Sequence, residues 1–128
     1  MKKAFLIDTD VMVDFFRGQR QAVELIRENS ASVILSAMVV VELYAGYRSN
    51  QERDKIDRLV SHAKVIPVSA QLASYAGLYL KQYAKSHGID IADAVIAATA
   101  EDQNAELKTL NVKHYPMFET LKPAYRKS

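Results

Sequence analysis

Three acidic residues stand in segments of the sequence that are otherwise apolar. Asp8 follows Ala-Phe-Leu-Ile, Glu42 is the only charged residue between Glu28 and Arg48, and Asp93 lies within Ile-Ala-Asp-Ala-Val-Ile-Ala-Ala. An ionised carboxylate that enters a protein core without a partner loses its hydration, at a cost of several kcal/mol. We therefore expect the three acids to share one site, whose natural occupant is a cation.

The ligand chemistry of carboxylates indicates a hard divalent cation at this site. Asp and Glu oxygens suit Mg2+ or Mn2+, whereas zinc prefers His and Cys. The chain has no Cys, and His62, His87 and His114 show no ligand spacing and are predicted to be surface residues. A Mg2+ ion held by carboxylates keeps water ligands, lowers the pKa of one of them and neutralises a phosphate oxygen in the transition state. The predicted chemistry is phosphodiester hydrolysis by a metal-activated water, without a covalent intermediate.

Polar residues beside these acids are candidates for supporting roles, and each has a structural alternative. Asp90 and Asp93 have the spacing of a helix capping box, which explains Asp90 but not the apolar surroundings of Asp93. Asp8 and Asp10 could each cap a first helix. Glu42 could instead form a buried salt bridge to an arginine. Hydroxyl groups at predicted strand ends add two further candidates, Thr9 and Ser36.

The composition is typical of one globular domain that spans residues 1–128. Hydrophobic residues make up 49% of the chain and charged residues 25%, and a chain of this length buries roughly 65–70% of its unfolded surface. The absence of Cys excludes disulfides, thiolate catalysis and Cys-ligated zinc. Because no apolar run suits a signal peptide or a membrane span, we expect a cytoplasmic protein without a membrane partner.

Apolar segments alternate with helical patterns along the chain, and this order must position the acids. We predict strands over 3–7, 32–35, 64–68 and 106–110. We predict helices over 19–28, 50–61, 69–86 and 90–104, and one more that follows the second strand and ends at Tyr47. The pattern predicts a three-layer α/β/α domain with a parallel sheet of four or five strands. The functional crevice of such sheets lies beyond the carboxyl ends of the strands, where Asp8, Ser36 and Asn111 are placed.

Taken together, these residues resemble the PIN-domain nucleases, and among them the VapC-type toxins of prokaryotic toxin–antitoxin pairs. The matching pieces are 8–14, which reads Asp-Thr-Asp-Val-Met-Val-Asp, the stretch 36–46 around Glu42, 93–100, and Thr-Leu-Asn at 109–111. The resemblance implies a metal site of Asp8, Glu42 and Asp93 and Mg2+- or Mn2+-dependent endoribonuclease activity. It also implies a homodimer and a small antitoxin protein that blocks the active site.

Two positions depart from the family pattern. Family members usually have Asn where Asp10 stands, so this chain carries an extra negative charge beside the site. The fourth acidic position is filled by Asn111, which leaves open whether one or two metal ions bind.

Two alternative functions compete with the nuclease interpretation. The segment from Leu6 to Val11 also fits the Asp-x-Asp-x-Val start of haloacid-dehalogenase-type phosphatases, in which Asp8 would be the nucleophile and Asp10 the acid and base. That scheme leaves Glu42 without a role. The second alternative is a non-catalytic RNA- or protein-binding module that keeps the acids as structural pairs.

Two surface patterns indicate partners. Basic residues dominate from residue 107 onward, and Lys108, Lys113 and Lys122 near Asn111 are predicted to contact RNA phosphates, with a solvated basic tail as the alternative. Asp14, one helical turn after Asp10, is expected to be solvated. Three tyrosines on one helix, Tyr75, Tyr79 and Tyr83, widen its apolar arc to roughly 140°, beyond the about 100° that a core-facing helix needs. This excess predicts a dimer or antitoxin interface, with a well-buried helix as the alternative.

Overall fold

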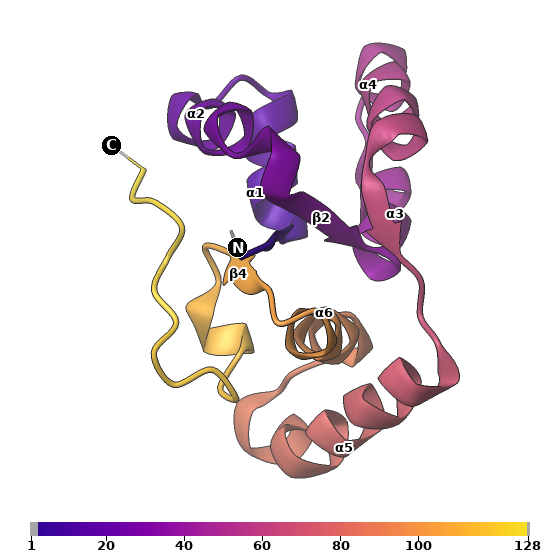
Figure 1. The fold of residues 1–128 in the computed structure, drawn as a ribbon, viewed down its shortest axis with the longest axis vertical. Coiled ribbons are helices and arrows are strands. Elements are labelled where there is room, and N and C mark those ends of the chain that lie inside the picture. Colours follow the sequence, from indigo (N-terminus) through magenta and orange to yellow (C-terminus); the bar gives the residue numbers. More distant parts are fainter. Residues whose placement is uncertain (1–2, 128) are drawn as a thin grey trace.

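A parallel sheet of four strands forms the centre of the structure, a computed structural model that describes residues 3–127 (Figure 1). The strands lie in the order β3-β2-β1-β4, so the first strand of the chain is central. Leu6 of β1 pairs with Ile34 of β2 and Leu107 of β4. The strand bounds are β1 Phe5–Ile7, β2 Val33–Ser36, β3 Lys64–Ile66 and β4 Glu106–Lys108.

Helices cover both faces of this sheet, which confirms the predicted three-layer α/β/α fold. Figure 1 shows α1 and α2 on one side of the strands and α6 on the other, with α5 packed outside α6. The helices are α1 Thr9–Phe16, α2 Arg20–Glu28, α3 Ala37–Gly46, α4 Asn50–His62, α5 Ala70–His87 and α6 Ile91–Asp102, with short 3-10 turns η1 Ser30–Ser32 and η2 Val112–His114. In residues 3–127, no helix combines the length and the apolar character needed to cross a bilayer.

The ends of the predicted helices agree with the structure, because local capping chemistry determines them. Ser69 caps α5 by accepting a hydrogen bond from the backbone of Leu72, and Gly88 ends that helix with a φ of +65°. Asp90 and Asp93 form the predicted capping box at the start of α6.

Three predicted strands are shorter than expected, and the first of them begins at Phe5 instead of at residue 3. The third ends at Ile66, since the next residue, Pro67, has no N–H for a sheet ladder. The fourth ends at Lys108 because the following residues turn toward the acids: the Leu110 N–H donates to Asp10 rather than to a neighbouring strand. The shortening of β4 therefore belongs to the construction of the site.

Helix α6 is the most deeply buried helix of the domain. Every residue from 94 to 100 is buried, and most of them are alanine, which allows close packing against the sheet on one side and α5 on the other. The start of this helix carries Asp93 to the edge of the sheet. The core thus holds one of the three predicted acids on a rigid element.

Helix α5 is only partly buried by its contact with α6. Tyr79 and Tyr83 are half-buried against the core, whereas Tyr75 is 39% exposed and Leu78 is 62% exposed. The apolar arc of α5 therefore divides into a buried part and an exposed part, and of the three tyrosines of the predicted interface only Tyr75 lies on the exposed part.

The C-terminal segment, residues 115–127, crosses the β4 edge of the sheet and ends beside α1 and α2 (Figure 1). The Ala124 N–H donates to the carbonyl of Thr109 at 2.8 Å. Asp14 of α1 accepts from the Tyr125 hydroxyl at 2.6 Å and from Lys127 at 3.0 Å. The expectation that Asp14 is solvated was wrong, because this segment returns to α1 and covers its carboxylate.

Candidate active site

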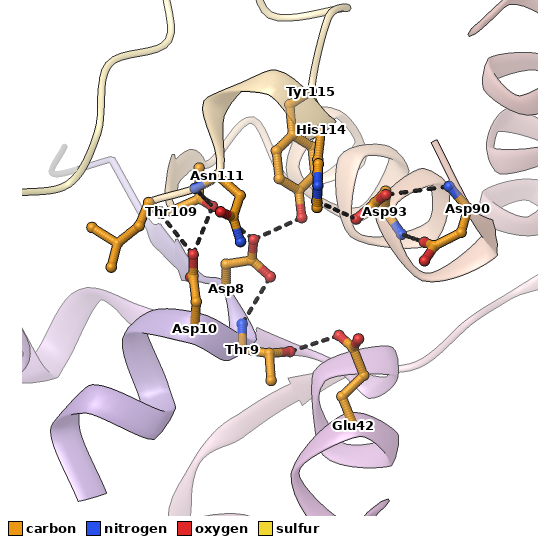
Figure 2. Close-up of polar contacts among 11 residues, drawn as sticks. Asp8, Thr9, Asp10, Glu42, Asp90, Asp93, Thr109, Asn111, His114 and Tyr115 are labelled. Carbon is orange, nitrogen blue, oxygen red and sulfur yellow. Dashed lines mark hydrogen bonds and ion pairs between the residues drawn. The ribbon is translucent and has the colours of Figure 1, made fainter. Parts of the chain in front are cut away.

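The predicted acids lie together around one pocket of about 270 Å3 at the carboxyl edge of the sheet (Figure 2). Asp8 comes from the end of β1, Glu42 from α3, and Asp93 from the start of α6. These positions follow from the parallel topology, which brings strand ends and the following helices to one edge. The complete lining is Asp8, Thr9, Asp10, Glu42, Asp90, Asp93, Asn111 and His114.

Asp8 is buried and accepts three hydrogen bonds from neighbouring donors. Its side chain caps α1, since Oδ1 accepts from the Thr9 N–H at 2.8 Å. Its other oxygen, Oδ2, accepts from the hydroxyls of Thr109 and Tyr115, each at 2.8 Å. Asp8, and not Asp10, therefore provides the cap of α1, and its carboxylate is held at the bottom of the pocket.

Asp10 adds a second carboxylate, which is half-buried, to the lining of the same pocket. It accepts from the Val11 N–H at 2.8 Å and the Leu110 N–H at 2.9 Å. Burial, together with the nearby charge of Asp8, nevertheless raises the pKa of Asp10 to about 6, because the two backbone hydrogen bonds only partly oppose these effects. Negative charge at this position is thus poorly compensated by the protein alone.

Glu42 reaches the pocket from α3 and is half-buried. Its Oε1 accepts a 2.7 Å hydrogen bond from the Thr9 hydroxyl, which gives Thr9 its predicted supporting place. Burial raises the pKa of Glu42, the Thr9 hydrogen bond opposes the shift, and the charges of Asp8 and Asp90 add to it. The salt-bridge alternative is not realised, as no basic side chain within residues 3–127 lies within 4 Å of Glu42.

Asp93 combines a structural contact with a place in the pocket. Its Oδ2 accepts from the Asp90 N–H at 3.2 Å, and its N–H donates to Asp90 Oδ1 at 2.9 Å. The other oxygen, Oδ1, lies 3.5 Å from His114 Nδ1. Burial raises the pKa of Asp93 to about 6; the backbone of Asp90 and the His114 ring oppose this shift, while the charge of Asp90 adds to it. The capping box thus uses one oxygen and leaves the other beside His114.

The donor set fits Mg2+ or Mn2+ in kind, because every candidate ligand is a carboxylate oxygen. Burial is the largest cause of the raised pKa values of Asp10 and Asp93, and the charges of neighbouring acids add to it, so a bound cation would favour their ionised forms. In the described part of the chain, however, no three Asp, Glu or His side chains are already arranged to hold a metal ion. Side-chain rotation toward the pocket centre is therefore needed for ligation.

Ser36 lies beneath the pocket and not in its lining. It is fully buried, its hydroxyl accepts from the Met38 N–H at 3.1 Å to cap α3, and Thr99 donates to it at 3.4 Å. Contact with a substrate phosphate is excluded at this depth. Ser36 instead sets where α3 begins, and so where Glu42 is placed.

The three lysines do not lie together at the pocket, which corrects their expected placement. Lys108 Nζ lies 2.9 Å from Glu106 and 4.6 Å from the ring centre of Phe5, so its side chain runs back along β4, away from the carboxyl edge. Lys108 and Lys122 line a different pocket beside β4. Lys113 is exposed on η2, and its neighbour in the sequence, His114, lines the pocket of the acids.

Three further residues at the site escaped the sequence analysis. Thr109 and Tyr115 donate to Asp8, and His114, which is exposed as predicted, lines the pocket and contacts Asp93. Asn111 also lines the pocket, from the turn after β4, as the strand-end argument predicts. Thr109 stood in the matched piece 109–111 without an assigned role, and no spacing marked His114 or Tyr115, although all three follow the fourth strand within a few positions.

Comparisons with known proteins agree with this geometry. The PIN-domain family model matches residues 5–115. Ribonuclease VapC10 of Mycobacterium tuberculosis is 37% identical over 123 residues, which covers 94% of this chain and 92% of that protein. Ribonuclease VapC19 of the same organism is 39% identical over 124 residues, covering 94% and 98%.

Solved structures share the fold. One chain of a toxin–antitoxin complex from Klebsiella pneumoniae superposes with a TM-score of 0.81 at 22% identity, covering 96% of this chain and 99% of that one. A chain of DNA-bound VapBC from Salmonella typhimurium gives 0.76 at 18% identity, covering 90% and 92%. With the family model spanning nearly the whole chain and relatives above 30% identity, this protein belongs to the PIN-domain family of VapC ribonucleases.

Proposed function

We propose that this protein is a metal-dependent endoribonuclease and the toxin of a toxin–antitoxin pair. The observation that carries the proposal is the acidic pocket of Asp8, Glu42 and Asp93, in a chain that is 37–39% identical to proteins named ribonucleases. Membership of the PIN-domain family removes support from the phosphatase alternative. A non-catalytic binding module remains the alternative that the experiment must exclude.

In this proposal, Asp8, Glu42 and Asp93 hold Mg2+ or Mn2+. When bound, such an ion supplies an activated water and neutralises charge on the scissile phosphate. Thr9 keeps Glu42 directed to the pocket, and the capping box with Asp90 fixes the start of the helix that carries Asp93. The protein's part in catalysis is thus to hold three carboxylates on rigid elements around one opening.

The decisive test is RNA cleavage by the purified protein, free of partner, with Mg2+, Mn2+ or a chelator. Asp8→Asn, Glu42→Gln and Asp93→Asn should each abolish cleavage, while Asp54→Asn, an exposed acid on α4, should not. Glu42→Gln and Asp93→Asn each remove a charge from a repelling cluster and keep an acceptor for their one donor, so they should also leave the metal-free protein equally stable or more stable. Cleavage that persists in chelator, or wild-type rates in any of the three variants, would refute the assignment; absence of cleavage in the wild type would favour a binding module.

A groove between α1, α2 and α4 supports the antitoxin proposal. It encloses about 640 Å3 and combines an apolar floor with a basic rim, which suits the apolar face of an acidic amphipathic segment. The floor consists of Phe15, Phe16, Val23 and Leu59, and the rim of Arg17, Arg27, Lys55 and Arg58. Arg27→Glu with Arg58→Glu should therefore weaken copurification with the product of an adjacent short reading frame, whereas Lys81→Glu on α5 should not.

We also propose a homodimer through the exposed part of α5. Tyr75 and Leu78 form an apolar surface beside the end of α6, and tyrosine is enriched in protein interfaces. Leu78→Glu should give a folded monomer in light scattering, because its side chain lies outside the core. A folded dimer in this variant would place the interface elsewhere.

A further inference from the structure

The two oxygens of the Asp8 carboxylate have different surroundings. A carboxylate oxygen has two lone-pair positions, and both positions of Oδ2 are used by the hydroxyls of Thr109 and Tyr115 at 2.8 Å (Figure 2). Oδ1 accepts one hydrogen bond within residues 3–127, from the Thr9 N–H. Asp8 therefore has one free lone pair, and it belongs to Oδ1.

Packing fixes both hydroxyl donors in place. Tyr115 is 1% exposed, and its ring stacks on Phe118 with centroids 6.5 Å apart. Thr109 is fully buried, and its hydroxyl oxygen accepts from the Asn111 N–H at 3.0 Å. Its single hydroxyl proton is committed to Asp8 at 2.8 Å, since Asp10 lies farther away, at 3.5 Å.

We infer that Thr109 and Tyr115 are positioning residues that make Asp8 a one-oxygen ligand and so select small divalent cations against Ca2+. The inference rests on the proposed metal-dependent function. Mg2+ requires near-octahedral geometry at about 2.0–2.1 Å and takes one oxygen from a carboxylate, whereas Ca2+ at about 2.3–2.6 Å also accepts both. Because two hydroxyls donate to Oδ2, this oxygen is not free to bind Ca2+ as a second ligand atom, whereas Mg2+ needs only Oδ1.

Removing one of the two hydroxyls should therefore change the ratio of the Ca2+ affinity to the Mg2+ affinity, and not only the two affinities themselves. Tyr115→Phe keeps the stacked ring and frees a lone pair on Oδ2. Changes to residues that orient a metal ligand alter affinity by about 10–100-fold. We expect Mg2+ binding to weaken while Ca2+ binding is retained through the second oxygen, so that the Ca2+/Mg2+ affinity ratio rises about tenfold, or 1.4 kcal/mol.

The experiment is a competition measurement on the purified protein without RNA. Bound Mn2+ is followed by electron paramagnetic resonance and displaced by Mg2+ or by Ca2+ in the wild type and in Tyr115→Phe. Thr109→Val removes the second hydroxyl, and Thr109→Ser is its matched control, because serine keeps the donor. The ratio should rise in Tyr115→Phe and Thr109→Val and stay near the wild-type value in Thr109→Ser.

The possible outcomes separate this inference from the proposed function. Equal weakening of both ions in Tyr115→Phe, or no change in either, would overturn the inference, since a purely structural role lowers both affinities together. If circular dichroism shows that Tyr115→Phe is unfolded, the Thr109→Val and Thr109→Ser pair decides by the same ratio. Wild-type binding that Asp8→Asn leaves unchanged would instead reject the metal site itself, and the inference with it.

Discussion

Asp10 is expected to destabilise the metal-free protein at neutral pH, and Asp10→Asn to stabilise it. Burial and the charge of Asp8 raise the pKa of Asp10 from 3.8 to about 6. The carboxyl of Asp10 therefore binds its proton more tightly in the folded protein than in the unfolded chain. It follows that the free energy of unfolding falls as the pH rises from about 4 to about 6 and stays low above that range.

The size of the effect follows from the difference between the two pKa values. A difference of about 2 pKa units corresponds to about 3 kcal/mol at pH 7.5, since one unit is worth about 1.36 kcal/mol. The Leu110 and Val11 N–H groups donate to different oxygens of Asp10. The Asn side chain presents one acceptor and one donor to these two N–H groups, as a protonated Asp does. The figure of about 3 kcal/mol compares the protonated with the ionised carboxyl, so it already includes the loss of one acceptor. We expect Asp10→Asn to gain about 2–3 kcal/mol at pH 7.5 and about 1 kcal/mol at pH 4.5.

Urea denaturation of the wild type and Asp10→Asn in chelator, at both pH values, measures this difference. Asp54→Asn is the control and should change the stability by less than about 0.5 kcal/mol, because Asp54 is an exposed residue of α4. The reasoning is refuted if Asp10→Asn brings no gain at pH 7.5, or if the gain is the same at both pH values.

Three further predictions concern the cap, the C-terminal segment and the basic residues. Asp90→Asn should retain most RNA cleavage, since Asn caps a helix nearly as well as Asp; a loss as large as in Asp93→Asn would make Asp90 part of the metal site. Tyr125→Phe removes a 2.6 Å hydrogen bond to a carboxylate of α1 and should lower the stability by about 1–2 kcal/mol in urea; an unchanged midpoint would mean that the segment detaches in solution. Lys113→Ala should reduce the salt dependence of RNA binding by about 0.7 in log–log slope, and Lys122→Ala should leave the slope unchanged; the reverse result, measured on a catalytically inactive protein, would place the RNA beside β4.

Sequence reasoning predicted the features that short-range physics determines. Hydrophobic periodicity and capping residues such as Ser69 and Gly88 act over a few positions, and the observed helix ends agree with them. The convergence of Asp8 and Glu42 follows from one general rule, that parallel strands end at a common edge, whereas Asp93 was assigned to the same site from its apolar surroundings and from the family resemblance. For this reason the pocket could be predicted without knowledge of any contact.

The partners of the acids could not be predicted in this way. Thr109 and Tyr115 meet Asp8 across sequence separations of 101 and 107 residues, and no local pattern encodes such a pairing. For Ser36, the sequence left open a supporting role and contact with phosphate, because a hydroxyl at a strand end can face the pocket or the core, and only the packing of α3 and α6 decides which. The direction of Lys108 depended likewise on Glu106, two positions earlier on the same strand.

The hydrogen bonds from Thr109 and Tyr115 to Asp8 can form only late in the synthesis of the chain. Asp8 is made first, and its two hydroxyl partners lie 101 and 107 residues later in the chain. At a translation rate of about 5–20 residues per second, the ribosome needs about 5–20 s to add them. During that interval β4 is also missing, so β1 has no neighbour on that side and Asp8 lacks its two hydroxyl donors. A nascent chain therefore cannot carry the finished pocket before residue 115 has been added.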